Sequence, residues 1–204
     1  MKVLLLNGSP RKEGNTSMAL GQVAEILEAE GIETVNMWIG NEPVRGCIGC
    51  GACAQKGRCV FHDSLYEEIL AVLDAGVDAF VVGTPVYFAG PNGSLCAILD
   101  RIFYSAGDRL AWKPAAGISV CRRGGASASF DRLNKYFAIN NMPIAGSQYW
   151  TIAYGRAPGE VASDGERMQT LRAMARNLAW MMRTAATEQH PAAEEPRQRT
   201  NFVR

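Results

Sequence analysis

The chain has 204 residues, 48% of them hydrophobic and 20% charged, and its length suits a single hydrophobic core. Its 21 basic and 20 acidic side chains give a formal net charge of +1, which excludes the broad basic surface of a nucleic-acid-binding protein. The amino terminus has only four consecutive apolar residues, too few for a signal peptide or a membrane span, so we expect a cytoplasmic protein with no membrane partner.

Strand-like and helix-like segments alternate along the chain. Short β-rich runs predict strands at 2–6, 34–38, 78–83, 117–121 and 147–152. Apolar spacing predicts helices from 15 or 16, at 64–74, at 94–104, around 130–137 and after 163, with capping boxes at Ser64–Glu67 and Ser163–Glu166. Strands that alternate with helices require a parallel sheet covered on both faces. We therefore predict a three-layer α/β sandwich with a five-stranded sheet in the flavodoxin-like order 2-1-3-4-5.

The domain organisation follows from the same pattern. Residues 1–184 are predicted to form one domain that includes a cysteine-rich loop at 46–60. Residues 185–204 are polar and contain proline until Phe202 and Val203, so we expect a C-terminal arm. In such sheets ligands bind beyond the carboxyl ends of the strands, so the loops after strands one to four are the ones to examine.

The loop after the first strand has the composition of an anion site. Residues Gly8–Ser17 combine small residues, hydroxyls and Arg11 with the start of a helix, and free helix amides favour a phosphate dianion. The segment matches neither a P-loop nor a dinucleotide-binding glycine motif, and it lacks the Cys-x5-Arg pattern of a phosphatase loop. An ordinary polar turn with helix caps is the alternative.

Two later loops suit a flat aromatic ligand. Tyr87 and Phe88 offer apolar walls for a heterocycle, although they could also pack under their loop as core. Residues Arg122–Gly125 offer two cations and a backbone without Cβ crowding. These features suit the pyrimidine end of a flavin or the phosphates of a second ligand, and a solvated arginine pair is the alternative.

Four of the six cysteines lie within thirteen residues, in the pattern Cys47-x2-Cys50-x2-Cys53-x5-Cys59. In reducing cytosol this grouping indicates metal binding or redox chemistry in preference to disulfides. Cys96 and Cys121 stand alone among apolar neighbours, so we expect both to be buried apolar residues.

Three motifs, Gly8-Ser-Pro-Arg-x3-Asn-Thr-Ser17, Thr84-Pro-Val-Tyr-x3-Pro91 and Leu99-Asp-Arg101, resemble the NADPH-dependent FMN reductase branch of flavodoxin-like proteins. Segments 158–161 and 200–204 are also similar to flavodoxin-family segments. The resemblance implies non-covalent FMN and a homodimer or homotetramer with the flavin at the subunit interface. It implies phosphate contacts from Ser9, Arg11, Asn15, Thr16 and Ser17. It places the ring against Pro85, Val86, Tyr87, Phe88, Gly90, Gly124 and Gly125.

The cysteine spacing resembles that of iron-sulfur flavoproteins, which hold a [4Fe-4S] cluster close to FMN. Four soft thiolates suit such a cluster, and glycines at 46, 49, 51 and 57 let the loop fold around it. Zinc, or redox-active thiols without metal, are the alternatives, although this spacing is tighter than the usual zinc pairs.

The expected function is an FMN-dependent oxidoreductase. It would pass electrons from NAD(P)H through FMN, directly or through the cluster, to a small-molecule or protein acceptor. No side chain is required as an acid or base because the flavin carries the chemistry. A non-catalytic electron carrier and a zinc-stabilised binding module are the two alternatives.

Overall fold

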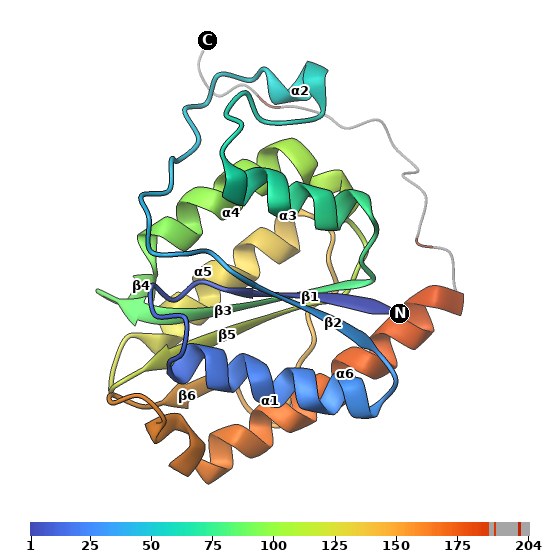
Figure 1. The fold of residues 1–204 in the computed structure, drawn as a ribbon. Helices are drawn as coiled ribbons and strands as arrows, with labels where there is room; N and C mark the ends of the chain where they lie inside the picture. Colours follow the sequence, from blue (N-terminus) through green and yellow to red (C-terminus); the bar gives the residue numbers. More distant parts are fainter. Residues whose placement is uncertain (188–189, 191–199, 201–204) are drawn as a thin grey trace.

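In the computed structural model, which describes residues 1–187, 190 and 200, a parallel sheet lies between two layers of helices (Figure 1). The parallel strands are β1 (Lys2–Asn7), β2 (Glu33–Trp38), β3 (Ala79–Tyr87), β5 (Ala115–Cys121) and β6 (Ile152–Tyr154). Their order is β2-β1-β3-β5-β6, which confirms the predicted 2-1-3-4-5 arrangement when these strands are counted alone. A further strand that was not predicted, β4 (Gly90–Pro91), pairs antiparallel with the end of β3.

The helices divide between the two faces of the sheet (Figure 1). Helices α1 (Asn15–Ala29) and α6 (Gly165–Thr187) cover one face. Helices α3 (Ser64–Asp74), α4 (Gly93–Ala106) and α5 (Ala126–Ile139) cover the other. A short helix α2 (Cys53–Lys56) lies within the cysteine-rich loop, and two 3-10 turns occupy 107–109 and 160–163.

Burial follows the apolar patterns of the sequence. In β1, Val3 and Leu5 pack into the core under α1 and α6, whereas Leu4 and Leu6 pack into the core under α3, α4 and α5. This alternation is expected of a strand buried on both faces. In α6 the predicted apolar face is buried in full, at Met168, Leu171, Ala175, Leu178 and Met182.

Both predicted capping boxes are displaced by one residue. Helix α3 is capped by Asp63 in place of Ser64, and the Asp63 carboxylate accepts the backbone N–H of Tyr66 at 3.2 Å. At the start of α6, Asp164 accepts the N–H of Arg167 at 3.3 Å. A carboxylate is favoured at these positions because it also meets the positive end of the helix dipole.

The fifth strand was predicted in the wrong place. It covers Ile152–Tyr154, whereas Tyr149 and Trp150 in the predicted range are half exposed. Instead, the Arg167 guanidinium lies over the Tyr149 ring, 4.6 Å from the ring centroid, so the ring makes a cation–π contact at the surface. The parallel ladder begins where the backbone N–H of Ser119 donates to the carbonyl of Thr151 at 3.0 Å, and it pairs Ser119–Cys121 with Ile152–Tyr154.

Two other elements are longer than predicted. Strand β3 continues past residue 83 to Tyr87 and turns back as a hairpin at Phe88 and Ala89, which both have positive φ. Helix α6 continues to Thr187, beyond the predicted start of the arm at 185. Most of that arm, including segment 201–204, lies outside the described residues. Among the residues that the structure describes, no helix combines the length and apolarity that crossing a bilayer requires.

Candidate functional site

The loops that follow β1 and β3 are joined at the carboxyl edge of the sheet. The backbone N–H of Gly8 donates to the carbonyl of Gly83 at 2.8 Å. A Cβ at position 8 would collide with Leu95 in α4. The close approach of backbone to helix therefore requires glycine at this position.

The predicted phosphate-binding residues lie on one turn and at the start of α1. Helix α1 begins after Gly14 without a side-chain cap, so its first amides are left for an anion. The Ser9 hydroxyl accepts the N–H of Arg11 at 3.1 Å, and Ser9 is buried. Arg11 is exposed and Ser17 half-buried, whereas Thr16 is buried with its methyl group facing Gly83.

The side chain of Asn15 is committed to another loop. Its Nδ2 donates to the carbonyl of Ala157 at 2.9 Å, and its Oδ1 accepts the N–H of Val161 at 3.2 Å. A Cβ on Gly155 would lie 2.7 Å from Asn15 Nδ2, so this loop packs closely on the start of α1. Asn15 therefore fastens the segment after β6 to the predicted phosphate loop.

Trp38 is a residue of this region that the sequence reasoning missed. Its indole Nε1 donates to the carbonyl of Ser9 at 2.6 Å. The Lys12 ammonium lies 6.0 Å from the ring centroid. Trp38 pairs with Asn7 at the carboxyl end of the β1–β2 ladder, so an aromatic residue at the last position of the second strand was the available signal.

The two segments predicted to hold the ring are in contact. Gly125 has a φ of +86°, and a Cβ there would lie 2.8 Å from Ala89 Cα and 3.2 Å from Val86 Cγ1. The loop after β5 thus packs on the β3–β4 hairpin. Tyr87 is 47% exposed and Phe88 is fully exposed, so neither ring is part of the core.

The loop after β2 leaves this edge and crosses over the outside of α3 and α4 (Figure 1). Its four thiols, Cys47, Cys50, Cys53 and Cys59, line one cavity of about 150 Å³ together with Arg101 and Ser105 of α4. Arg101 and Ser105 lie eight and twelve residues beyond Gly93, or about 12 and 18 Å along the helix from the end of α4 that follows the β3–β4 hairpin. Within one chain, the cysteines are therefore not gathered with the loops after strands one, three and four.

The cysteine cavity suits a soft metal or an iron-sulfur cluster by its donor set. Backbone N–H groups donate to two of the sulfur atoms, from Gly49 to Cys47 at 3.4 Å and from Phe61 to Cys59 at 3.5 Å. Among the described residues, no three ligating side chains already stand close enough to hold a metal ion. Gly49 and Gly51 have positive φ, so the backbone between the ligands turns where only glycine does so without strain.

Arg101 is the charged side chain of this cavity, and it is 1% exposed. Burial lowers its pKa, but the contacts with Cys59 and Asp63 outweigh that effect and leave the pKa above the ordinary value. The hydroxyl of Tyr66 accepts the N–H of Cys59 at 2.9 Å and meets the Ser105 hydroxyl at 2.7 Å. These buried contacts attach the cysteine loop to α3 and α4.

The two remaining cysteines differ from each other. Cys121 is buried, as predicted, whereas the same prediction for Cys96 is wrong, because Cys96 is only half-buried. Burial raises the pKa of both thiols, so neither is activated as a thiolate.

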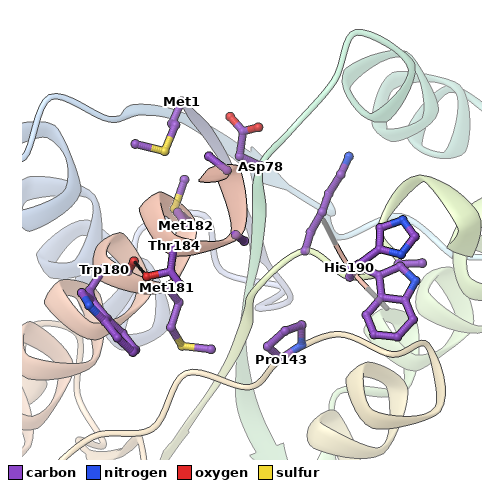
Figure 2. Close-up of a pocket in the computed structure, with 13 residues that line it drawn as sticks. Met1, Asp78, Pro143, Trp180, Met181, Met182, Thr184 and His190 are labelled. Atoms are coloured by element: carbon purple, nitrogen blue, oxygen red, sulfur yellow. Dashed lines mark hydrogen bonds between the residues drawn. The ribbon is translucent and has the colours of Figure 1, made fainter. Parts of the chain in front are cut away.

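A larger cavity of about 600 Å³ lies at the opposite, amino edge of the sheet (Figure 2). It is lined by apolar side chains of α6, including Trp180 and Met182, and by Trp112, whose ring stacks on His190 at 5.0 Å. Lys113 lines it too, and burial lowers the pKa of that ammonium. The predicted cofactor-binding residues lie at the other edge.

Comparison with known proteins identifies relatives along nearly the whole chain. The family model of NADPH-dependent FMN reductases matches residues 1–157. An iron-sulfur flavoprotein of Methanocaldococcus jannaschii is 30% identical over 189 residues, covering 88% of this chain and 96% of that protein. An iron-sulfur flavoprotein of Methanosarcina thermophila is 30% identical over 184 residues, covering 87% of this chain and 93% of the relative. The solved structure of RosB with bound 8-demethyl-8-formylriboflavin-5'-phosphate superposes with a TM-score of 0.71 at 16% identity, covering 100% of this chain and 92% of that one.

Proposed function

The chain belongs to the NADPH-dependent FMN reductase family and is an FMN-dependent oxidoreductase, and from this premise we propose the site and the path of its electrons. FMN binds at the carboxyl edge of the sheet, and NAD(P)H is the electron donor. Bound FMN supplies the capacity to accept a hydride and release its electrons in one or two steps. A small molecule or a redox protein in the cytoplasm is the acceptor.

The contact between the β3–β4 hairpin and the Gly124–Gly125 loop is the observation that carries this proposal. This contact brings the two predicted ring segments together at the carboxyl end of β3 and β5. The uncapped start of α1 lies at the same edge of the sheet, after the neighbouring strand β1. We assign the phosphate to Ser9, Arg11, Thr16, Ser17 and the first amides of α1. Asn15 contributes by its backbone, because its side chain holds the 157–161 loop.

The ring is assigned to the hairpin and the glycine loop, at Pro85, Val86, Tyr87, Phe88, Gly90, Gly124 and Gly125. Phe88 is fully exposed and the adjacent Tyr87 is 47% exposed, and this pair of exposed rings supports a homodimer or homotetramer in which a second copy covers the flavin edge. The residues of this chain bind and orient the cofactor, and none of them is required to move a proton.

We further propose that Cys47, Cys50, Cys53 and Cys59 hold a [4Fe-4S] cluster. Four thiols in one cavity and two N–H donors to sulfur support this assignment, as does the 30% identity to proteins named iron-sulfur flavoproteins. The cluster supplies one-electron transfer. The chain's own part is to bring four thiolates to one cavity, which Phe61 and Tyr104 also line; Cys47 and Cys50 are exposed there, and Cys53 and Cys59 are half-buried.

The test is a visible spectrum of anaerobically purified protein, with flavin, iron and sulfide quantified per chain, followed by NAD(P)H oxidation with a quinone, azo or ferric acceptor. We expect one FMN, four iron atoms per chain as a [4Fe-4S] cluster contains, and turnover. FMN without iron overturns the cluster assignment, and a colourless protein with one zinc overturns both cofactors. FMN with no turnover with either nucleotide identifies an electron carrier.

A further inference from the structure

Arg101 occupies an unusual position for a charged residue. It lies on the apolar face of α4 among Leu95, Ile98 and Ile102, and its side chain has no exposed area. Arginine is almost never buried to this extent unless it is paired. Its partners therefore indicate what it does.

Those partners lie at the two ends of the cysteine loop. The Arg101 guanidinium donates to the carbonyl of Phe61 at 2.8 Å and to the carbonyl of Arg45 at 3.4 Å. Arg45 precedes the first cysteine by two residues, and Phe61 follows the last cysteine by two. One side chain thus joins both ends of the loop to helix α4.

The same guanidinium faces the thiols. Arg101 contacts Cys59, and it is the one charged side chain among the described residues that line the four-cysteine cavity. Its Nε is buried and has no hydrogen-bond partner within the described part of the chain. Its counter-ion, Asp63, lies 2.6 Å from the guanidinium but is 43% exposed, so water screens that carboxylate more than it screens Arg101.

We propose that Arg101 is the positioning residue of the cysteine site: it fixes the ends of the ligand loop and places a buried positive charge beside the thiolates. The inference rests on the proposed function for the identity of the occupant, a four-thiolate iron-sulfur cluster. Reduction by one electron adds one negative charge to such a cluster. A fixed cation beside it therefore stabilises the reduced state and raises the reduction potential.

Two substitutions separate charge from packing. Arg101→Met removes the charge and all the hydrogen bonds but keeps an unbranched apolar stem, and it should lower the reduction potential. Asp63→Asn removes the counter-charge but retains a good helix cap, and it should raise the potential. We expect each to change the reduction equilibrium by about tenfold, which is ~59 mV for a one-electron couple. Arg132→Met, on α5, removes an exposed cation that pairs with Asp100 and is the matched control.

The measurement is a redox titration of the holoprotein followed by electron paramagnetic resonance, with iron and FMN quantified in each variant. Opposite shifts for Arg101→Met and Asp63→Asn support the proposal. Shifts of the two reduction potentials in the same direction, or no shift, overturn the electrostatic part of the proposal. Loosening of the loop alone would not shift the potentials of the two variants in opposite directions.

A second readout does not depend on the cluster. The rate at which the half-buried Cys59 thiol reacts with a maleimide in metal-free protein should rise about tenfold or more in Arg101→Met, and partly recover in Arg101→Lys, because opening of the loop limits that rate. The exposed thiols of Cys47 and Cys50 are the internal reference, since they react without opening of the loop. Unchanged rates with an intact far-UV spectrum overturn the positioning role. If wild-type protein holds FMN but no iron, the cluster assignment and the predicted effect of Arg101 on the reduction potential are both wrong. The maleimide reaction rate still decides whether Arg101 holds the loop.

Discussion

The carboxyl edge of the sheet and the cysteine loop are built by different means. The first is set by strand topology, because β1, β3 and β5 deliver their loops side by side and glycines at 8 and 125 allow close contact. The second lies outside the helix layer and is attached by polar contacts from Arg101 and Tyr66. Backbone architecture therefore specifies the carboxyl edge, which is the proposed flavin region, whereas a few buried side chains specify the cysteine loop, which is the thiol region. A substitution that disrupts one of these two regions should therefore leave the other intact.

The largest expected effect is the loss of iron from a ligand variant. In Cys50→Ser, a hard hydroxyl replaces a soft thiolate in the cysteine cavity, so iron content should fall to background while FMN stays bound. Metal analysis and flavin absorbance measure the two cofactors in one sample. Cys96→Ala, outside the loop, is the control and should keep both. Loss of FMN along with the iron in Cys50→Ser would show that the regions are coupled.

The complementary variant breaks the flavin region. Gly125→Val forces a β-branched residue into a φ of +86° and against Ala89, at a cost of about 1–2 kcal/mol from the backbone alone. Displacement of the hairpin should weaken FMN binding by about tenfold or more, measured by fluorescence titration of apoprotein. Gly146→Val, outside the two ring segments, is the matched control, because a Cβ there meets nothing within 4 Å and the backbone has no positive φ. Equal losses in the two variants would contradict the close-contact argument.

A smaller effect is expected from removing one hydroxyl at the loop anchor. Tyr66→Phe leaves the part-buried N–H of Cys59 without its acceptor and removes the buried contact with the Ser105 hydroxyl, which should lower the free energy of unfolding by about 1–3 kcal/mol. Denaturant titration measures the loss, and FMN affinity should not change. Tyr104→Phe, with a 74% exposed ring, is the control. A loss of FMN affinity in Tyr66→Phe would place the anchor inside the flavin region.

The smallest effect concerns pH. Hydrogen bonds from His62, and then from Arg58, lower the pKa of the Glu67 carboxyl below its usual 4.5. Since the folded pKa is the lower one, the stabilisation is present above pH 4.5 and is lost as pH falls through the folded value. Glu67→Gln should therefore differ slightly from wild type at pH 6 and converge with it at about pH 3 in urea titrations. Glu68→Gln is the neighbouring control, and a difference that grows towards acid would refute the assignment.

The sequence is sufficient to predict most of the sheet and helices because their apolar periods are long and regular. The face of α6 is one case, and the buried alternation of β1 is another. The fifth strand was misplaced because aromatic residues at 149 and 150 resemble a strand locally, whereas Tyr149 contacts Arg167 at the surface and Trp150 packs against Tyr149. Short strands at the edge of a sheet are decided by pairing with distant residues, which local pattern does not contain.

The candidate site shows the same division. The turn at 8–17 was predicted as one unit because its residues are contiguous. The position of the cysteine loop over α4 could not be predicted, since it depends on contacts between Arg101 and carbonyls 40 and 56 residues away. A signal was present nonetheless: Arg101 interrupts the apolar face made by Ile98 and Ile102. A charge on a buried face predicts a buried partner.

Trp38 gives the flavin region an optical reporter of its own. Its indole is hydrogen-bonded to the backbone of the predicted phosphate loop, whereas Trp112 and Trp180 line the cavity at the opposite edge. Emission from Trp38 should therefore respond to ligands that order this loop. In a variant that retains this tryptophan alone, the cofactor's arrival could be followed in real time by ultraviolet light, with no label attached to the protein.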